Sequence, residues 1–131
     1  MDSDVAVYLA KAAESLDTAE SELRARRYNS CANRCYYAAF QAAIAALIEA
    51  GIRGTSDEWP HKFVQSSFAG QLINRRRLYP PAHRSTLSDL QHLRSRADYS
   101  LDLITEVEAN RGFRRCRDFV EAVQQKAGGR R

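Results

Sequence analysis

Residues 28–51, YNSCANRCYYAAFQAAIAALIEAG, decide the fold of this chain. From residue 35 to residue 48 only Gln41 is strongly polar, so in a helix the apolar residues would cover every side. A helix that is apolar all round is buried, either inside a protein or inside a membrane. This span is too short and too rich in alanine to cross a bilayer, which takes about 20 apolar residues. We therefore expect residues 28–51 to form the central helix of a soluble bundle.

Small side chains recur along one side of this expected helix, at alternating spacings of three and four. They are Cys31, Cys35, Ala38, Ala42 and Ala45. Because the distance between two packed helices depends on the side chains at their contact, this stripe allows a neighbouring helix to approach closely. The aromatic residues on the other sides are expected to fill wider gaps.

The chain before the central segment also has a helical pattern. Apolar residues between positions 5 and 23 recur at spacings of three and four, and Asp2 and Asp4 offer an N-cap and a negative first turn. Residues 24–29 form a short polar break, and short connections of this kind join antiparallel neighbours. Gly51 is expected to end the central helix as a glycine just past its last turn.

Two further helices are expected between Gly51 and residue 104. The third helix of the chain begins at Trp59-Pro60, with proline in its first turn, and runs to Arg75-Arg76-Arg77. Pro80-Pro81 is a stop signal because proline lacks the N–H that continues a helix. The fourth helix is expected from about Ala82 and should fray near residues 99–104.

The last helix is expected to follow Thr105-Glu106-Val107-Glu108, a capping-box pattern with Thr105 as N-cap. With 131 residues the chain has the size of one domain. The sequence therefore predicts an all-α bundle of about five helices over residues 1–127, followed by a flexible tail at residues 128–131.

The net charge of +4 is distributed unevenly, because arginines crowd the second half of the chain. Arginine is favoured where phosphate groups are bound through two hydrogen bonds at once. A basic face that is only solvated is the alternative interpretation, and charge alone does not separate the two.

The cysteines and the beginning of the chain indicate where the protein works. The three cysteines Cys31, Cys35 and Cys116 all fall in helical patterns, and an odd number fits free thiols in a reducing cytoplasm. No nearby histidine or third cysteine completes a metal site with Cys31 and Cys35, so we expect small buried side chains there. The acidic start Met1-Asp2-Ser3-Asp4 indicates no signal peptide. We expect a cytoplasmic protein without metal or cofactor.

One charged residue interrupts the apolar pattern of the predicted fourth helix. Continuing the inner stripe of Leu87 and Leu90 by four residues places Arg94 on the seam, and Asp98 shares its face. A charge at an inner position must be paired or line a cleft, because burying it alone is very costly. Two interpretations stay open: a structural ion pair that locks the helix end, or an arginine facing a groove, oriented by Asp98, with Tyr99 beside it.

The segment LRSRADY at residues 93–99 resembles the LRxxADY signature of HEPN-domain proteins, small helical proteins of prokaryotic toxin–antitoxin and defence loci. NRCYYAAFQAA at residues 33–43 is similar to the second helix of that subfamily, and His61-Lys62-Phe63 with Phe68 is similar to its third. The resemblance extends over residues 9–123. It implies an up-and-down helical bundle that commonly dimerises.

The resemblance also implies a site. In active HEPN ribonucleases an Arg, followed about four to six residues later by a His, comes from each subunit and builds a metal-independent RNA-cleaving cleft. Arg94 matches that Arg, but Tyr99 stands where the His would fall. Tyrosine, with a reference pKa of about 10, is a poor base, whereas histidine is suited to proton transfer near neutral pH. His61 and His83 could approach Arg94 only through folding.

We expect the catalytic residues to be Arg94, Asp98 and Tyr99. The expected substrate-binding residues are Arg34, Tyr37, His61, Lys62 and Arg96.

Two function classes stay open. The first is a toxin-like ribonuclease, a homodimer in which Arg94 holds the scissile phosphate. The second is a non-catalytic HEPN module that binds RNA, a nucleotide or a cognate nucleotidyltransferase antitoxin. In related pairs the transferase adds nucleotides to a tyrosine whose position falls here at Leu101, so Tyr99 is the only tyrosine close enough to substitute. No membrane partner is expected.

Overall fold

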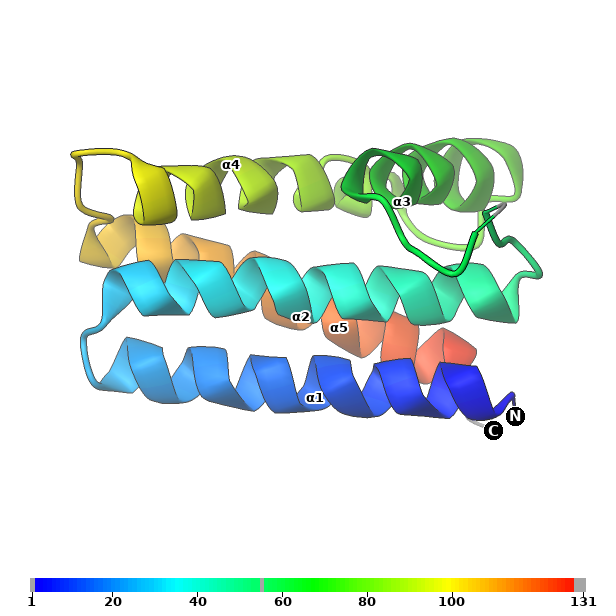
Figure 1. The fold of residues 1–131 in the computed structure, drawn as a ribbon, viewed down its shortest axis with the longest axis horizontal. Helices are drawn as coiled ribbons and strands as arrows, with labels where there is room; N and C mark the ends of the chain where they lie inside the picture. The colour runs from blue at the N-terminus through cyan, green and yellow to red at the C-terminus, as the bar shows by residue number, and fades with distance from the viewer. Residues whose placement is uncertain (1, 55, 129–131) are drawn as a thin grey trace.

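The computed structural model describes residues 2–54 and 56–128. They form five α-helices and no strand: α1 (Ser3–Arg24), α2 (Tyr28–Glu49), α3 (His61–Ser67), α4 (Thr86–Tyr99) and α5 (Glu106–Ala127). A π-helical segment, η1 (Phe68–Arg75), continues α3, and a 3-10 turn, η2 (Pro81–His83), precedes α4. Figure 1 shows α1 and α2 side by side, α3 and α4 along the other side of α2, and α5 crossing behind it. The prediction of an all-α bundle is confirmed.

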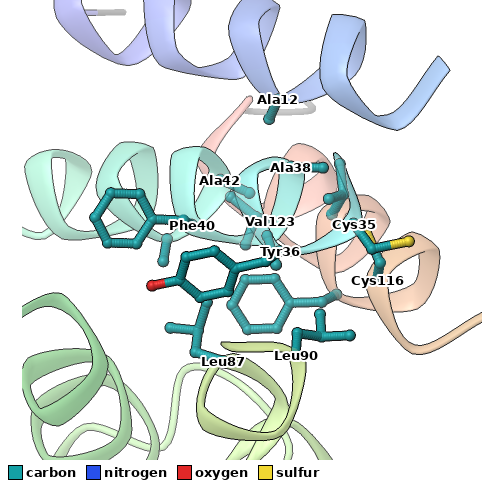
Figure 2. Close-up of a cluster of buried hydrophobic side chains, with 14 of the residues drawn as sticks. Ala12, Cys35, Tyr36, Ala38, Phe40, Ala42, Leu87, Leu90, Cys116 and Val123 are labelled. Atoms are coloured by element: carbon teal, nitrogen blue, oxygen red, sulfur yellow. The ribbon is translucent and has the colours of Figure 1, made fainter. Parts of the chain in front are cut away.

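The helix α2 lies at the centre of the bundle, as its composition predicts. It contacts α1, α3, α4 and α5, and every residue from position 42 to position 48 is buried. Figure 2 shows Ala12 of α1 facing Ala38 and Ala42, so the stripe of small side chains is where α1 approaches. Gln41, the polar exception, shares a hydrogen bond of 2.8 Å with the buried Ser15 of α1.

The predicted signals at three helix ends are confirmed. The side chain of Asp2 accepts a hydrogen bond from the backbone of Asp4 and caps α1. Gly51 has a φ of 79°, and its N–H and that of Ile52 donate to carbonyls of the last turn of α2. This is the Schellman pattern, which favours glycine because an L side chain is strained at positive φ. Thr105 and Glu108 form the capping box of α5.

Other predicted boundaries were wrong by a few residues. The break after α1 covers only residues 25–27, because Arg26 turns the chain at a φ of 61° and α2 begins at Tyr28. Pro60 caps α3 from an extended conformation and does not lie within its first turn. The helix α4 begins at Thr86, since the chain between the two prolines and Thr86 forms η2 and a turn.

The flexible tail predicted at residues 128–131 lies mostly outside the described residues, because only Gly128 belongs to them.

The three cysteines are buried and unpaired, as predicted. Sγ of Cys31 lies 3.8 Å from Sγ of Cys35, and that contact, together with burial, raises the pKa of the Cys31 thiol. The pKa of the Cys35 thiol is also raised, chiefly by its contact with Cys116. None of the helices in the described ranges is long and apolar enough to span a membrane.

Candidate functional site

The motif helix α4 places Arg94 against two aromatic rings of α2. The guanidinium carbon of Arg94 lies 5.4 Å from the ring centroid of Tyr36 and 5.6 Å from that of Tyr37. Leu90 and Leu87, one and two turns before Arg94, are buried, and Figure 2 shows them on the same side of α2 as Tyr36. Contacts of this kind hold a cation through the negative face of the ring.

Arg94 also forms the ion pair that its spacing predicts. Its Nη1 donates to Oδ2 of Asp98 at 3.3 Å, and Nδ2 of Asn33 donates to the same oxygen at 3.1 Å. Oδ1 of Asn33 accepts in turn from Nε and Nη2 of Arg34, at 3.0 and 2.8 Å. The guanidinium of Arg34 lies 5.2 Å from the Tyr37 ring centroid. A continuous polar chain therefore joins α2 to the end of α4.

Arg94 is neither fully buried nor fully solvated. Its side chain is 13% exposed and that of Asp98 is 25% exposed. Nε of Arg94 is buried without a hydrogen-bond partner in the described part of the chain, whereas no buried orphan is found at Nη2. A partly exposed guanidinium can donate to the oxygens of an anion through N–H groups that are not already bonded.

A surface hollow lies beside Asp98, between α1, α2 and the end of α4. Its volume is about 340 Å³. It is lined by Thr18, Glu22, Asn29, Ser30, Asn33, Arg34 and Asp98. The polar chain from Arg34 to Asp98 is thus reachable from solvent on this side.

Folding brings His61, the first residue of α3, to the same pair of tyrosines. Nδ1 of His61 forms a short hydrogen bond with Oη of Tyr36. The imidazole stacks on Phe40, with ring centroids 4.5 Å apart, and meets Tyr37 edge-on at 6.3 Å. Burial, followed by the positive charge of Arg94, lowers the pKa of His61 below its usual value. His61 and Arg94 therefore share one face of α2.

Two glutamines outside the predicted site residues extend this cluster. Nε2 of Gln65 donates to Oη of Tyr36 at 3.3 Å and to Oε1 of Gln91 at 2.6 Å. Burial raises the pKa of Tyr36, against the effects of Gln65 and Arg94. The available signal was helical spacing, because Gln65 follows His61 by one turn and Gln91 precedes Arg94 by about one turn.

The remaining predicted residues lie apart from this cluster. Tyr99, the last residue of α4, is 79% exposed. Arg96 faces α5, where its Nη1 donates to Oε2 of Glu108 at 2.5 Å. That contact is the main cause that lowers the pKa of Glu108 to about 2. Lys62 is exposed on α3. Among the predicted site residues, folding thus brings together Arg94, Asp98, Arg34, Tyr37 and His61.

Comparison with known proteins agrees with this arrangement of helices. The sequence matches the family model of the HEPN domain over residues 5–126, from the first turns of α1 to the last turn of α5. A comparison with curated proteins found no match.

Proposed function

The chain belongs to the HEPN-domain family, and on this premise we propose that it binds or acts on RNA as a toxin-like component of a toxin–antitoxin or defence system. The proposed contact surface contains Arg94, Asp98 and Tyr99 and lies at the interface of a cytoplasmic homodimer. RNA would bind there through its phosphate groups.

The observation that carries this proposal is the arrangement around Tyr37. Arg34 and Arg94 both lie against its ring, and only one carboxylate, that of Asp98, belongs to their hydrogen-bonded chain. Two guanidinium groups with one acid give this hydrogen-bonded chain a net positive charge, and Glu22, the other acid at the hollow, is paired with Arg27. Phosphate is the ligand that such a surface suits, because guanidinium groups match its oxygens in geometry and charge.

Exposed apolar side chains next to the motif support the homodimer. Beyond Tyr99, the chain carries Leu101, Leu103 and Val107 in exposed positions, at the α4–α5 connection and the start of α5. Contiguous exposed apolar surface favours a protein interface. An interface with two-fold symmetry would use this patch twice and would bring the two motif helices together.

The second candidate function is a non-catalytic module that binds RNA, a nucleotide or a cognate nucleotidyltransferase. The exposure of Tyr99 favours the transferase, because a tyrosine that is modified must be reachable by the modifying enzyme. The pairing of Arg94 with Asp98 and the tyrosine at the expected histidine position favour a role without cleavage.

A binding and degradation assay tests both functions. Purified protein is titrated with a fluorescent single-stranded RNA, and the integrity of that RNA is followed separately. Arg94→Ala should weaken binding by about tenfold or more, since one charge-assisted phosphate contact is lost. Arg24→Ala is the matched control, because Arg24 also pairs with an acid four residues away, Glu20, but on the exposed side of α1. Equal affinity of Arg94→Ala and wild type would contradict the proposal.

A further inference from the structure

We propose that His61 presents its Nε2–H as a hydrogen-bond donor to the phosphate that Arg94 binds, and that it does not act as a general base. This inference rests on the proposed function, because it assigns a second contact to the same ligand. It gives His61 a role that the motif on α4 does not contain.

The positions of the hydrogen atoms follow from the chain Gln91–Gln65–Tyr36–His61. Oε1 of Gln91 accepts from Nε2 of Gln65, and this contact orients the Gln65 amide so that its second N–H donates to Oη of Tyr36. The Tyr36 hydroxyl has one hydrogen of its own, and Nδ1 of His61 is the remaining partner within the described chain. Tyr36 therefore donates and Nδ1 accepts. In a neutral imidazole the other nitrogen, Nε2, then carries the hydrogen.

The residues around His61 keep its imidazole neutral, with the hydrogen on Nε2. A proton added to the ring would have to be placed on Nδ1, where the Tyr36 hydrogen already points. The rings of Tyr36, Tyr37 and Phe40 contact the imidazole, and Arg94 is the charged group that acts on it; none of these is an acid that would stabilise an imidazolium. Burial and the charge of Arg94 act in the same direction by lowering the pKa of His61. The ring is consequently neutral at pH 7.

A neutral donor beside an arginine is suited to binding an anion. A second positive charge next to Arg94 would be repelled by it, whereas a neutral N–H can donate to a phosphate oxygen without that cost. The same arrangement makes Nε2 unable to accept the 2′-hydroxyl proton, which is the step that a base must perform in metal-free RNA cleavage. His61 is therefore a binding residue and does not replace the missing motif histidine.

The tautomer can be measured directly. In protein labelled with ¹⁵N-histidine, long-range ¹H–¹⁵N correlation spectra at pH 7 distinguish a nitrogen that carries hydrogen from one that does not. The chain has three histidines, and His61→Gln identifies which signals belong to His61. We expect Nδ1 without hydrogen and Nε2 with hydrogen. Hydrogen on Nδ1 would leave Nε2 free to act as a base, which would overturn the proposal.

Binding of a hexameric uridine oligoribonucleotide tests the donor role. We expect His61→Ala to lower the affinity by about tenfold, as for loss of a hydrogen bond to a charged group. In His61→Gln the amide Nε2 can donate from a similar position, so this variant should recover most of the affinity. His92→Ala is the matched control, because His92 is exposed on the neighbouring α4. Equal weakening in His61→Ala and His61→Gln would contradict a donor role, and so would wild-type affinity in His61→Ala.

Arg94→Ala, measured with the same oligonucleotide, separates the role of His61 from the proposed function. If Arg94→Ala weakens binding and His61→Ala does not, the role of His61 is wrong and the proposed function stands. If neither substitution changes the affinity, both the role of His61 and the proposed function are wrong. Thermal unfolding of each variant identifies any loss of binding that is caused by misfolding.

Discussion

Arg94 and Asp98 meet on one face of α4, with Nη1 of the arginine 3.3 Å from Oδ2 of the carboxylate, and their side chains are 13% and 25% exposed. The pair is therefore intermediate between a buried structural ion pair and an ion pair that is open to solvent. A fully buried pair that loses one partner is destabilised by about 3–5 kcal/mol, whereas an exposed pair contributes about 1 kcal/mol or less. Asp98 also accepts from Asn33, so removal of Arg94 does not leave it without a donor.

We therefore expect Arg94→Ala to lower the free energy of unfolding by about 2 kcal/mol, the sum of a weakened ion pair and lost contacts with Tyr36 and Tyr37. Urea unfolding of the variant and of wild type measures this difference. Asp98→Asn is the companion variant, because it keeps a hydrogen-bond acceptor for Arg94. A loss of about 4 kcal/mol or more, with unchanged RNA binding, would show that the pair only holds the scaffold together.

The buried histidine makes stability depend on pH. His61 has a lowered pKa in the folded protein, so below about pH 6.5 the unfolded chain binds more protons and stability falls as the pH falls. His83 has a lowered pKa for the same main reason, burial, and contributes with the same sign. We expect His61→Gln to remove part of the slope below about pH 6.5 in urea unfolding.

His83→Gln should remove another part of that slope, and His92→Ala is the control. Carboxylates such as Glu108, with a pKa of about 2, lose their stabilising effect only at lower pH, so the two contributions can be separated. An unchanged slope in His61→Gln would mean that His61 is equally easy to protonate in the folded and unfolded protein.

The thiols should be unreactive in the native protein. Cys31, Cys35 and Cys116 are buried, and the pKa values of Cys31 and Cys35 are raised, so little thiolate is available to react. We expect labelling by a thiol reagent to be slow without denaturant and to reach all three cysteines in urea. Fast labelling of any one of them in the native state would contradict the packing described for α2 and α5.

The exposed apolar residues next to the motif should control the oligomeric state. We expect a homodimer at micromolar concentration by light scattering and a monomer in the double variant Leu101→Glu/Leu103→Glu, because charged side chains oppose burial of the patch. Val7→Glu is the control, since Val7 is an exposed apolar residue near the start of α1, and Figure 1 shows that start at the other end of the bundle from the α4–α5 connection. A wild-type monomer would contradict the dimer, and a dimeric double variant would locate the interface elsewhere.

Local patterns in the sequence were sufficient for the helices and several of their ends. Burial of α2 follows from its composition, and Gly51, Asp2 and Thr105 act through residues within a few positions of each other. The same holds for Arg94 and Asp98, whose spacing of four places them on one face of any helix. The HEPN family could likewise be identified from short motifs and their order.

Only the tertiary structure decided which residues surround Arg94. His61 reaches it because α3 starts beside Tyr36 of α2, and no local pattern specifies that placement. The π-helical course of η1, which buries Phe68 and Leu72 in the core, has no sequence signal either. Tyr99, the last residue of the motif, lies exposed at the helix end, whereas His61, distant in sequence, lies against the same rings as Arg94. Helical periodicity acts over a few residues, but a site built from three helices depends on how their side chains fit together.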